Sequence, residues 1–170
     1  MDSTQTLRAP FARDAVARTG LGAVVLAGAV ATVAFDLFGQ GLSPLAGFAR
    51  LAPVGLAESV LQVVLGGKIA GAGHFLHYLA GLVAYPLGWL LIAAPAARRI
   101  APWAPRHLVA VLYGVALWVF ALFFMAHLIA GLPAFLGFSG IAWVALLGHV
   151  IYALALAGTL HRLQRTNAAA

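Results

Sequence analysis

The residues of this sequence that could do chemistry are one aspartate and a set of histidines inside long apolar segments. Asp36 lies near the end of the first segment, and His74 and His77 lie near the start of the second. His127 lies near the end of the third, and His149 lies close to the centre of the fourth. An ionisable side chain within a membrane span costs free energy unless it meets a partner or water. These residues are therefore the candidates for a functional site.

The positions of these residues along the expected helices predict which of them meet. At about 1.5 Å of rise per residue, Asp36, His77 and His127 each lie roughly one to two turns inside the outer ends of the first three spans. We expect them to share one level of the membrane. His74 is one turn from His77 on the same helical face, and His149 lies deeper, near the midplane.

Three kinds of chemistry fit this cluster, and the spacing does not decide among them. In the first, the protein binds a haem b iron or a divalent metal such as zinc or copper. The candidate haem ligands are His77, His127 and His149, and the candidate metal ligands are Asp36, His74, His77 and His127. In the second, these groups relay protons or ions in a transporter-like or quinone-binding site. In the third, each histidine hydrogen-bonds a backbone carbonyl or Asp36, which stabilises the bundle by on the order of 1 kcal/mol per pair.

Motifs of known enzyme classes are absent from the sequence. It has no G-x-S-x-G, no H-E-x-x-H and no phosphate-binding glycine loop. The acidic residues beyond the N-terminal tail are Asp36 and Glu58, too few for glycoside hydrolysis, and the absence of cysteine excludes thiolate metal sites and cysteine nucleophiles. The sequence therefore favours a protein that is not an enzyme.

The composition indicates that the surroundings of these residues are lipid. Of the 170 residues, 64% are apolar and 8% are charged, whereas about 25% are charged in a typical soluble domain. The net charge of +6 comes from basic residues beside the apolar segments, which is typical of a membrane protein and excludes nucleic acid as a partner. The expected partners are the lipid bilayer and either other membrane subunits or further copies of the chain.

Four apolar stretches are long enough to cross a hydrocarbon core of about 30 Å. Their approximate limits are Gly20–Phe38, Gly73–Ala94, His107–Ala130 and Ser139–Leu160. Helices are expected because an open strand edge in lipid leaves backbone groups unpaired. The sequence thus predicts an all-α, polytopic membrane protein with four transmembrane helices, in which residues 1–170 form one helix-bundle domain.

The basic residues predict the orientation in a bacterial inner membrane. With a cytoplasmic N-terminus, the inner segments hold Arg8, Arg13, Arg18, Arg98, Arg99, Arg106, Arg162 and Arg165. The outer segments hold only Arg50 and Lys68. Because lysine and arginine concentrate on the cytoplasmic side, both termini are expected in the cytoplasm.

Two further patterns concern packing. In the outer loop after the first span, Glu58, Ser59 and Gln62 recur three to four residues apart, which predicts a short interfacial helix over Leu56–Leu65. Small residues let membrane helices approach closely. The glycines expected on packing faces are Gly22, Gly28, Gly81, Gly88, Gly114, Gly148 and Gly158.

Short motifs in all four spans resemble a known kind of protein. They are G-A-V-A-T-V-A-F-D (28–36), H-F-L-H-Y-L-A-G (74–81), L-Y-G-V-A-L-W (112–118) and G-H-V-I-Y (148–152). This set is similar to the YagU-like, small four-helix inner-membrane proteins of bacteria. The resemblance implies a fold and a location and supplies no activity.

An internal repeat is also suggested, because residues 73–78 resemble 148–152 and residues 35–44 resemble 126–133. Spans one and two would then be one helical hairpin, and spans three and four a second copy of it. The function expected from all these patterns is that of an accessory or small subunit of a membrane assembly. The alternative is a haem- or metal-binding redox or transport component that uses the His/Asp cluster.

Overall fold

The computed structural model describes residues 19–169, with side chains described up to residue 166, and its regular elements are all helical. Four helices are long and apolar enough to cross a membrane, as the sequence predicts. They are Leu21–Leu45, Ala72–Ile100, Arg106–Ile129 and Gly140–Thr166. Three basic residues used for the predicted orientation, Arg8, Arg13 and Arg18, lie outside the described residues.

Most of these spans alternate between α-helical and wider, π-helical segments. The first contains α2 (Leu21–Asp36), the π segment η1 (Leu37–Leu42) and α3 (Ser43–Leu45). The second contains α5 (Ala72–Leu79), η2 (Ala80–Ala84), α6 (Tyr85–Gly88), η3 (Trp89–Ala93) and α7 (Ala94–Ile100). The third contains α8 (Arg106–Val119) and the π segment η4 (Phe120–Ile129). The fourth is α9 (Gly140–Ala169).

Proline accounts for three of the π segments. Pro44, Pro86 and Pro95 each lie in the α-helical turn that directly follows η1, η2 and η3. A proline has no N–H to donate and its ring clashes with the carbonyl four residues earlier, so the preceding turn widens and its carbonyls bond to donors further along. Inside lipid this keeps the backbone hydrogen-bonded.

Two spans are therefore longer than expected. The second continues past Pro95, which the sequence places in a connecting loop, and ends at Ile100. The first continues past Phe38 to Leu45, so Asp36 lies deeper within its helix than expected.

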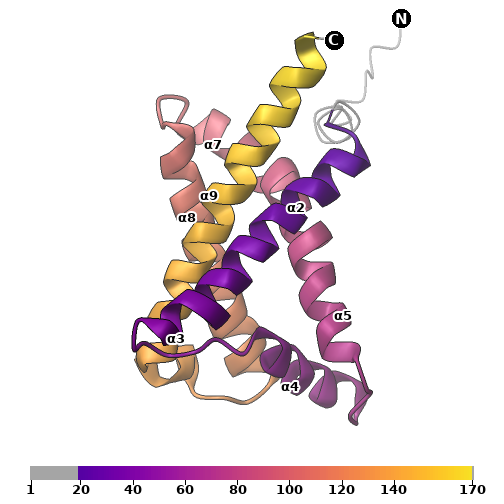
Figure 1. The fold of residues 1–170 in the computed structure, drawn as a ribbon, viewed down its shortest axis with the longest axis vertical. Helices are drawn as coiled ribbons and strands as arrows, with labels where there is room; N and C mark the ends of the chain where they lie inside the picture. The colour runs from indigo at the N-terminus through magenta and orange to yellow at the C-terminus, as the bar shows by residue number, and fades with distance from the viewer. Residues whose placement is uncertain (1–18, 170) are drawn as a thin grey trace, which may run out of the picture.

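α9 is the central helix of the bundle and packs along both α2 and α8 (Figure 1). The second span packs on α2 through η2 and α6, and on α8 through η3. The beginning of α2 and the end of α9 lie at one end of the bundle, where α7 and α8 are also joined (Figure 1).

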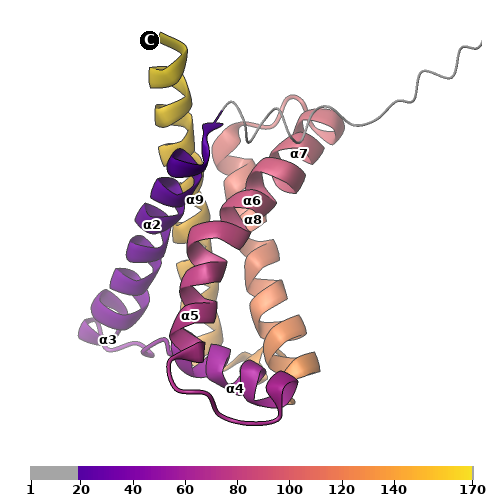
Figure 2. The same cartoon turned by 90° about the vertical axis from the view of Figure 1, so that its right-hand side faces the viewer.

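The helix expected in the first loop is present as α4 (Pro53–Leu65), three residues longer at its N-terminus than predicted. Pro53 begins it, and Gly66, with a φ of 72°, follows it in the left-handed conformation that favours glycine. α4 lies across the opposite end of the bundle, where it packs against α5 and η4 (Figure 2).

The third and fourth spans are joined by a tight connection, η5 (Ala134–Phe138). Phe135 and Leu136 have φ values of 50° and 52°, which a residue with a side chain rarely adopts. The Phe135 ring packs on Trp118, with 4.6 Å between ring centroids, and on Phe123, at 5.6 Å. These aromatic contacts hold the strained turn in place.

Two glycines allow the backbones of neighbouring spans to come into direct contact. A Cβ atom at Gly28 would lie 2.6 Å from the carbonyl oxygen of Leu82, and one at Gly114 would lie 2.6 Å from the Cα atom of Val150. Each hairpin, spans one–two and spans three–four, thus contains a backbone-to-backbone contact at a glycine. Gly22 and Gly158, also expected on packing faces, have no such neighbour within 4 Å.

Replacing Gly114 by alanine is expected to lower the free energy of unfolding by about 1–3 kcal/mol, because the new methyl group meets backbone atoms of α9 that cannot turn away. The matched control is Gly158→Ala, whose methyl group meets open space. Thermal unfolding of both variants in detergent, followed by circular dichroism, measures the difference. Equal unfolding midpoints would contradict the close packing of α8 on α9.

Candidate functional site

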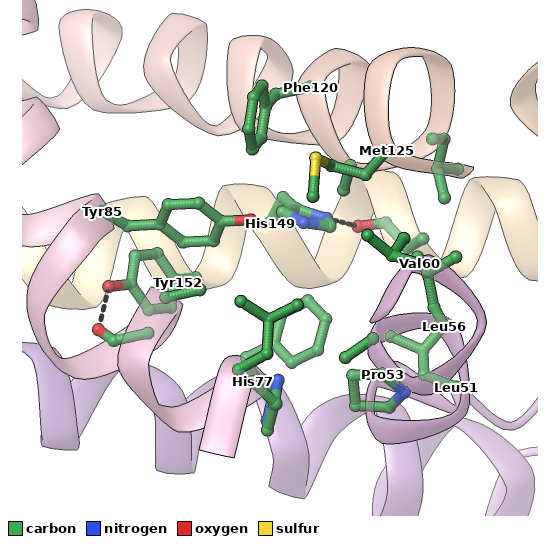
Figure 3. A pocket seen from close by; sticks show the side chains of 18 of the residues that line it. Leu51, Pro53, Leu56, Val60, His77, Tyr85, Phe120, Met125, His149 and Tyr152 are labelled. Atoms are coloured by element: carbon green, nitrogen blue, oxygen red, sulfur yellow. Dashed lines mark hydrogen bonds between the residues drawn. The ribbon is translucent and has the colours of Figure 1, made fainter. Parts of the chain in front are cut away.

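The candidate site is a cavity of about 310 Å³ inside the bundle, at the end that α4 covers. Its walls come from all four spans, from α4 and from η5, and they are mainly aliphatic and aromatic (Figure 3). The lining residues with polar side-chain atoms are Thr32, His77, Tyr85, His149 and Tyr152.

At its end of the bundle, α4 lies between the second and third spans and forms one wall of the cavity. α4 packs against α5 on one side and η4 on the other. Leu56, Ala57 and Val60 of α4 line the cavity, and Leu122 and Met125 of η4 line it as well. π-helical turns are frequent at functional sites, and here η2 and η4 both form walls.

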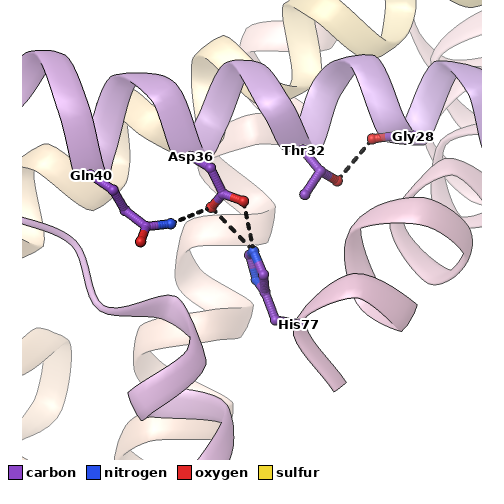
Figure 4. A network of polar contacts seen from close by, with 5 residues as sticks. All are labelled: Gly28, Thr32, Asp36, Gln40 and His77. Carbon is purple, nitrogen blue, oxygen red and sulfur yellow. Dashed lines mark hydrogen bonds and ion pairs between the residues drawn. The ribbon is translucent and has the colours of Figure 1, made fainter. Parts of the chain in front are cut away.

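Asp36 and His77 form a polar pair between the first and second spans (Figure 4). The Nε2 atom of His77 lies 3.2 Å from each carboxylate oxygen of Asp36. The Gln40 side-chain amide, one turn along the same helix, donates to Asp36 Oδ1 at 2.8 Å. The side chains of His77 and Asp36 are 13% and 23% exposed. The Asp36 carboxylate therefore has two hydrogen-bond donors, Gln40 and His77. His77 is also one of the residues that line the cavity.

His149 contributes an unused nitrogen to the same cavity. Its Nδ1 atom donates to the Ala145 carbonyl at 2.7 Å, and the residue is only 7% exposed. No hydrogen bond reaches Nε2 from the residues that the structure describes. Among those residues, every fully buried side-chain nitrogen or oxygen has a partner, so the unpartnered Nε2 is not fully buried. Nε2 therefore faces the cavity. The Phe35 ring separates the two histidines, 5.1 Å from His149 and 6.3 Å from His77 between ring centroids.

Tyrosine hydroxyls hold the cavity walls together. Tyr152 of α9 donates to the Gly81 carbonyl of η2 at 2.5 Å, and Tyr113 of α8 donates to the Tyr85 carbonyl at 2.6 Å. Both acceptors belong to the proline-interrupted second span, where side chains from neighbouring helices bond backbone groups. The Tyr85 ring meets the Tyr152 ring edge to face, at 5.8 Å between centroids, inside the cavity.

The structure brings together some of the predicted site residues and not others. Asp36 and His77 meet as expected, and His149 shares the cavity with His77. The His127 Nδ1 atom donates instead to the Leu132 carbonyl at 2.8 Å, and the residue does not line the cavity. His74 is exposed. Among residues 19–169, no group of three or more histidine, aspartate or glutamate side chains is placed to hold a metal ion.

The predicted ligands, as they lie in this structure, do not come together as a haem or metal site. The hydrogen bonding of one of them, His149, is nevertheless typical of a metal ligand. Histidine ligands commonly donate their other ring nitrogen to a carbonyl, as His149 does to Ala145. Haem and metal binding stay predictions.

Sequence reasoning missed Tyr85, Tyr152 and Phe35 as site residues. A signal was present for the two tyrosines, because a phenol far from the ends of a membrane span needs a hydrogen-bond partner. No comparable signal marks Phe35, whose role depends on where α2 crosses α9.

The Asp36–His77 pair is expected to contribute about 1 kcal/mol to stability beyond the separate effects of its two members. A double-mutant cycle of Asp36→Asn and His77→Phe, measured by unfolding in detergent, gives this coupling energy. The control cycle combines Asp36→Asn with His74→Phe, at an exposed histidine one turn away, and should show none. The same coupling in both cycles would mean that the pair has no specific effect.

No protein family, no curated protein and no solved structure was found to match this chain. The resemblance to YagU-like inner-membrane proteins therefore stays a prediction from short motifs.

Proposed function

We propose that this protein binds a small, mainly apolar molecule within the membrane, in the cavity under α4. The volume of about 310 Å³ is at the lower end of the range of about 300–1,000 Å³ for small-molecule sites. Such sites combine apolar and aromatic walls with a few placed polar groups, and His77, Tyr85 and His149 are groups of that kind.

The observation that carries the proposal is the state of His149. A polar atom in an apolar interior costs free energy when it lacks a hydrogen-bond partner. The His149 ring is largely buried, and its Nε2 atom, which is not itself fully buried, faces the mainly apolar cavity without a protein partner among the described residues. A bound molecule that supplies this hydrogen bond would remove the cost, which gives the cavity a preference for a ligand with a polar group.

The predicted role as an accessory or small subunit of a membrane assembly concerns partners, on which the cavity has no bearing, and it stays a prediction. The alternative of a haem- or metal-binding redox or transport component has less support, because His127 and His74 do not line the cavity.

Ligand binding can be tested by photolabelling with trifluoromethyl phenyl diazirine, a single apolar ring that reacts where it is bound. In protein reconstituted into lipid nanodiscs, peptide mass spectrometry should find labelling of cavity residues that saturates with probe concentration. Ala121→Phe, at a buried alanine of the cavity wall, should abolish the saturable labelling because the new ring fills the cavity.

The matched control is Ala116→Phe, five residues earlier on the same span and exposed. It should leave the saturable labelling unchanged. Labelling that rises linearly at all positions would show only lipid-facing probe, and the proposed function would be wrong.

We further propose that the end of the bundle holding the α7–α8 connection faces the cytoplasm of a bacterial cell. Five arginines support this: Arg98, Arg99, Arg106, Arg162 and Arg165 lie at or near that end. At the opposite end, Arg50 precedes α4 and Lys68 follows it. An excess of arginine and lysine marks the cytoplasmic side of a membrane protein.

Because the chain has no cysteine, single cysteines can report this orientation directly. In spheroplasts, a membrane-impermeant maleimide is expected to label Lys68→Cys before lysis and Thr166→Cys only after it. Both sites are exposed. The reverse pattern would overturn the orientation, and labelling of both before lysis would overturn the four-span topology.

A further inference from the structure

We infer that the ligand of the cavity is an aromatic ring with a hydroxyl group, a phenol or a quinol, whose O–H donates a hydrogen bond to His149 Nε2. This inference rests on the proposed function and adds the chemical class of the ligand.

The bond to Ala145 decides which kind of polar group the ligand must bring. A carbonyl oxygen can only accept, so the proton on His149 lies on Nδ1, which donates to Ala145 at 2.7 Å. In the neutral ring Nε2 then has a lone pair and can only accept. A protonated, charged ring at this position would be costly, because the residue is buried and the cavity is mainly apolar. The ligand must therefore supply a donor.

The neighbouring groups do not take that role within the described part of the chain. His77 lines the cavity from the second span, and its Nε2 atom is bonded to Asp36. The Tyr152 hydroxyl donates to Gly81. The Tyr85 hydroxyl has no hydrogen bond in the described residues, and in Figure 3 it points toward His149.

Tyr85 completes the recognition of a hydroxyl group. One hydroxyl oxygen can donate its proton to His149 Nε2 and at the same time accept a hydrogen bond from the Tyr85 O–H. A carbonyl or ether oxygen can use only the second of these bonds. The pair of an acceptor and a donor thus selects an alcohol over a ketone or an ether.

The walls select a ring. Phe35 meets His149 edge to face, at 5.1 Å and 73°. Tyr85 meets Phe120 at 6.5 Å and 86°, and Tyr152 at 5.8 Å and 84°. Aromatic rings favour such edge-to-face and offset arrangements with one another. A cavity with the volume of about ten water molecules holds one substituted ring, and an alkyl substituent can pass along the apolar wall that α4 provides.

The test compares para-hexylphenol with its methyl ether as competitors of the diazirine label in nanodiscs. The two differ in the hydroxyl proton and one methyl group. Concentrations are expressed in the lipid phase, after partitioning of each compound has been measured. The phenol is expected to protect the cavity at about tenfold lower concentration than the ether, because only the phenol donates to His149.

Variants separate the roles of the two polar residues. In His149→Phe the ratio between phenol and ether should fall to about one. In Tyr85→Phe both competitors should weaken alike and the ratio should stay near tenfold, because both oxygens accept from Tyr85. His74→Phe, outside the cavity, is the control and should behave as the original protein.

The outcomes distinguish this inference from the proposed function. Saturable labelling with equal protection by phenol and ether would overturn the inference and leave the binding function in place. A ratio that persists in His149→Phe would also overturn it. If His149→Phe does not fold, the ratio in the original protein and in Tyr85→Phe still decides. Absence of saturable labelling would remove the function and the inference together.

Discussion

The organisation of this protein depends on the requirement that backbone carbonyls inside lipid find hydrogen-bond donors. Each proline within the first two spans removes one backbone N–H donor, and a widened π-helical turn precedes each of them, at η1, η2 and η3. Tyrosine hydroxyls from α9 and α8 bond the carbonyls of Gly81 and Tyr85 in the interrupted second span. The same two bonds fix the position of the second span against the rest of the bundle, and so they shape the cavity.

The way the four spans and α4 pack produces both close backbone contacts and the cavity. Where glycine allows it, at Gly28 and Gly114, backbones of neighbouring spans touch. Toward the α4 end, α4 lies between α5 and η4, and side chains surround a space. The contacts at Gly28 and Gly114 stabilise the bundle through van der Waals attraction. The end under α4 keeps room for chemistry around His149.

Much of this could be predicted from the sequence. The four spans and the helix at α4 follow from apolar length and from polar periodicity, and the Asp36–His77 pair follows from the depth of two ionisable groups. The remainder depends on how the spans cross. The depth of His127 in its span does not predict that its ring bonds the Leu132 carbonyl, just beyond the end of its own span. A proline such as Pro95 indicates the end of a helix in the sequence, whereas in the structure the helix continues through it to Ile100. The cavity has no local signal, because its walls come from segments far apart in the chain.

The widened turns also affect how this sequence must be compared with others. A single π turn inserts one extra residue into an α-helix. Side chains after the turn are therefore rotated by about 100° about the helix axis relative to those before it. Heptad-like or 3.6-residue patterns therefore change phase at η1, η2 and η3, each of which is followed by further α-helix. A relative with straight helices would align with this chain only if a one-residue gap were allowed at each of these places. Relationships that ungapped similarity misses can thus be sought by allowing a gap at those three positions.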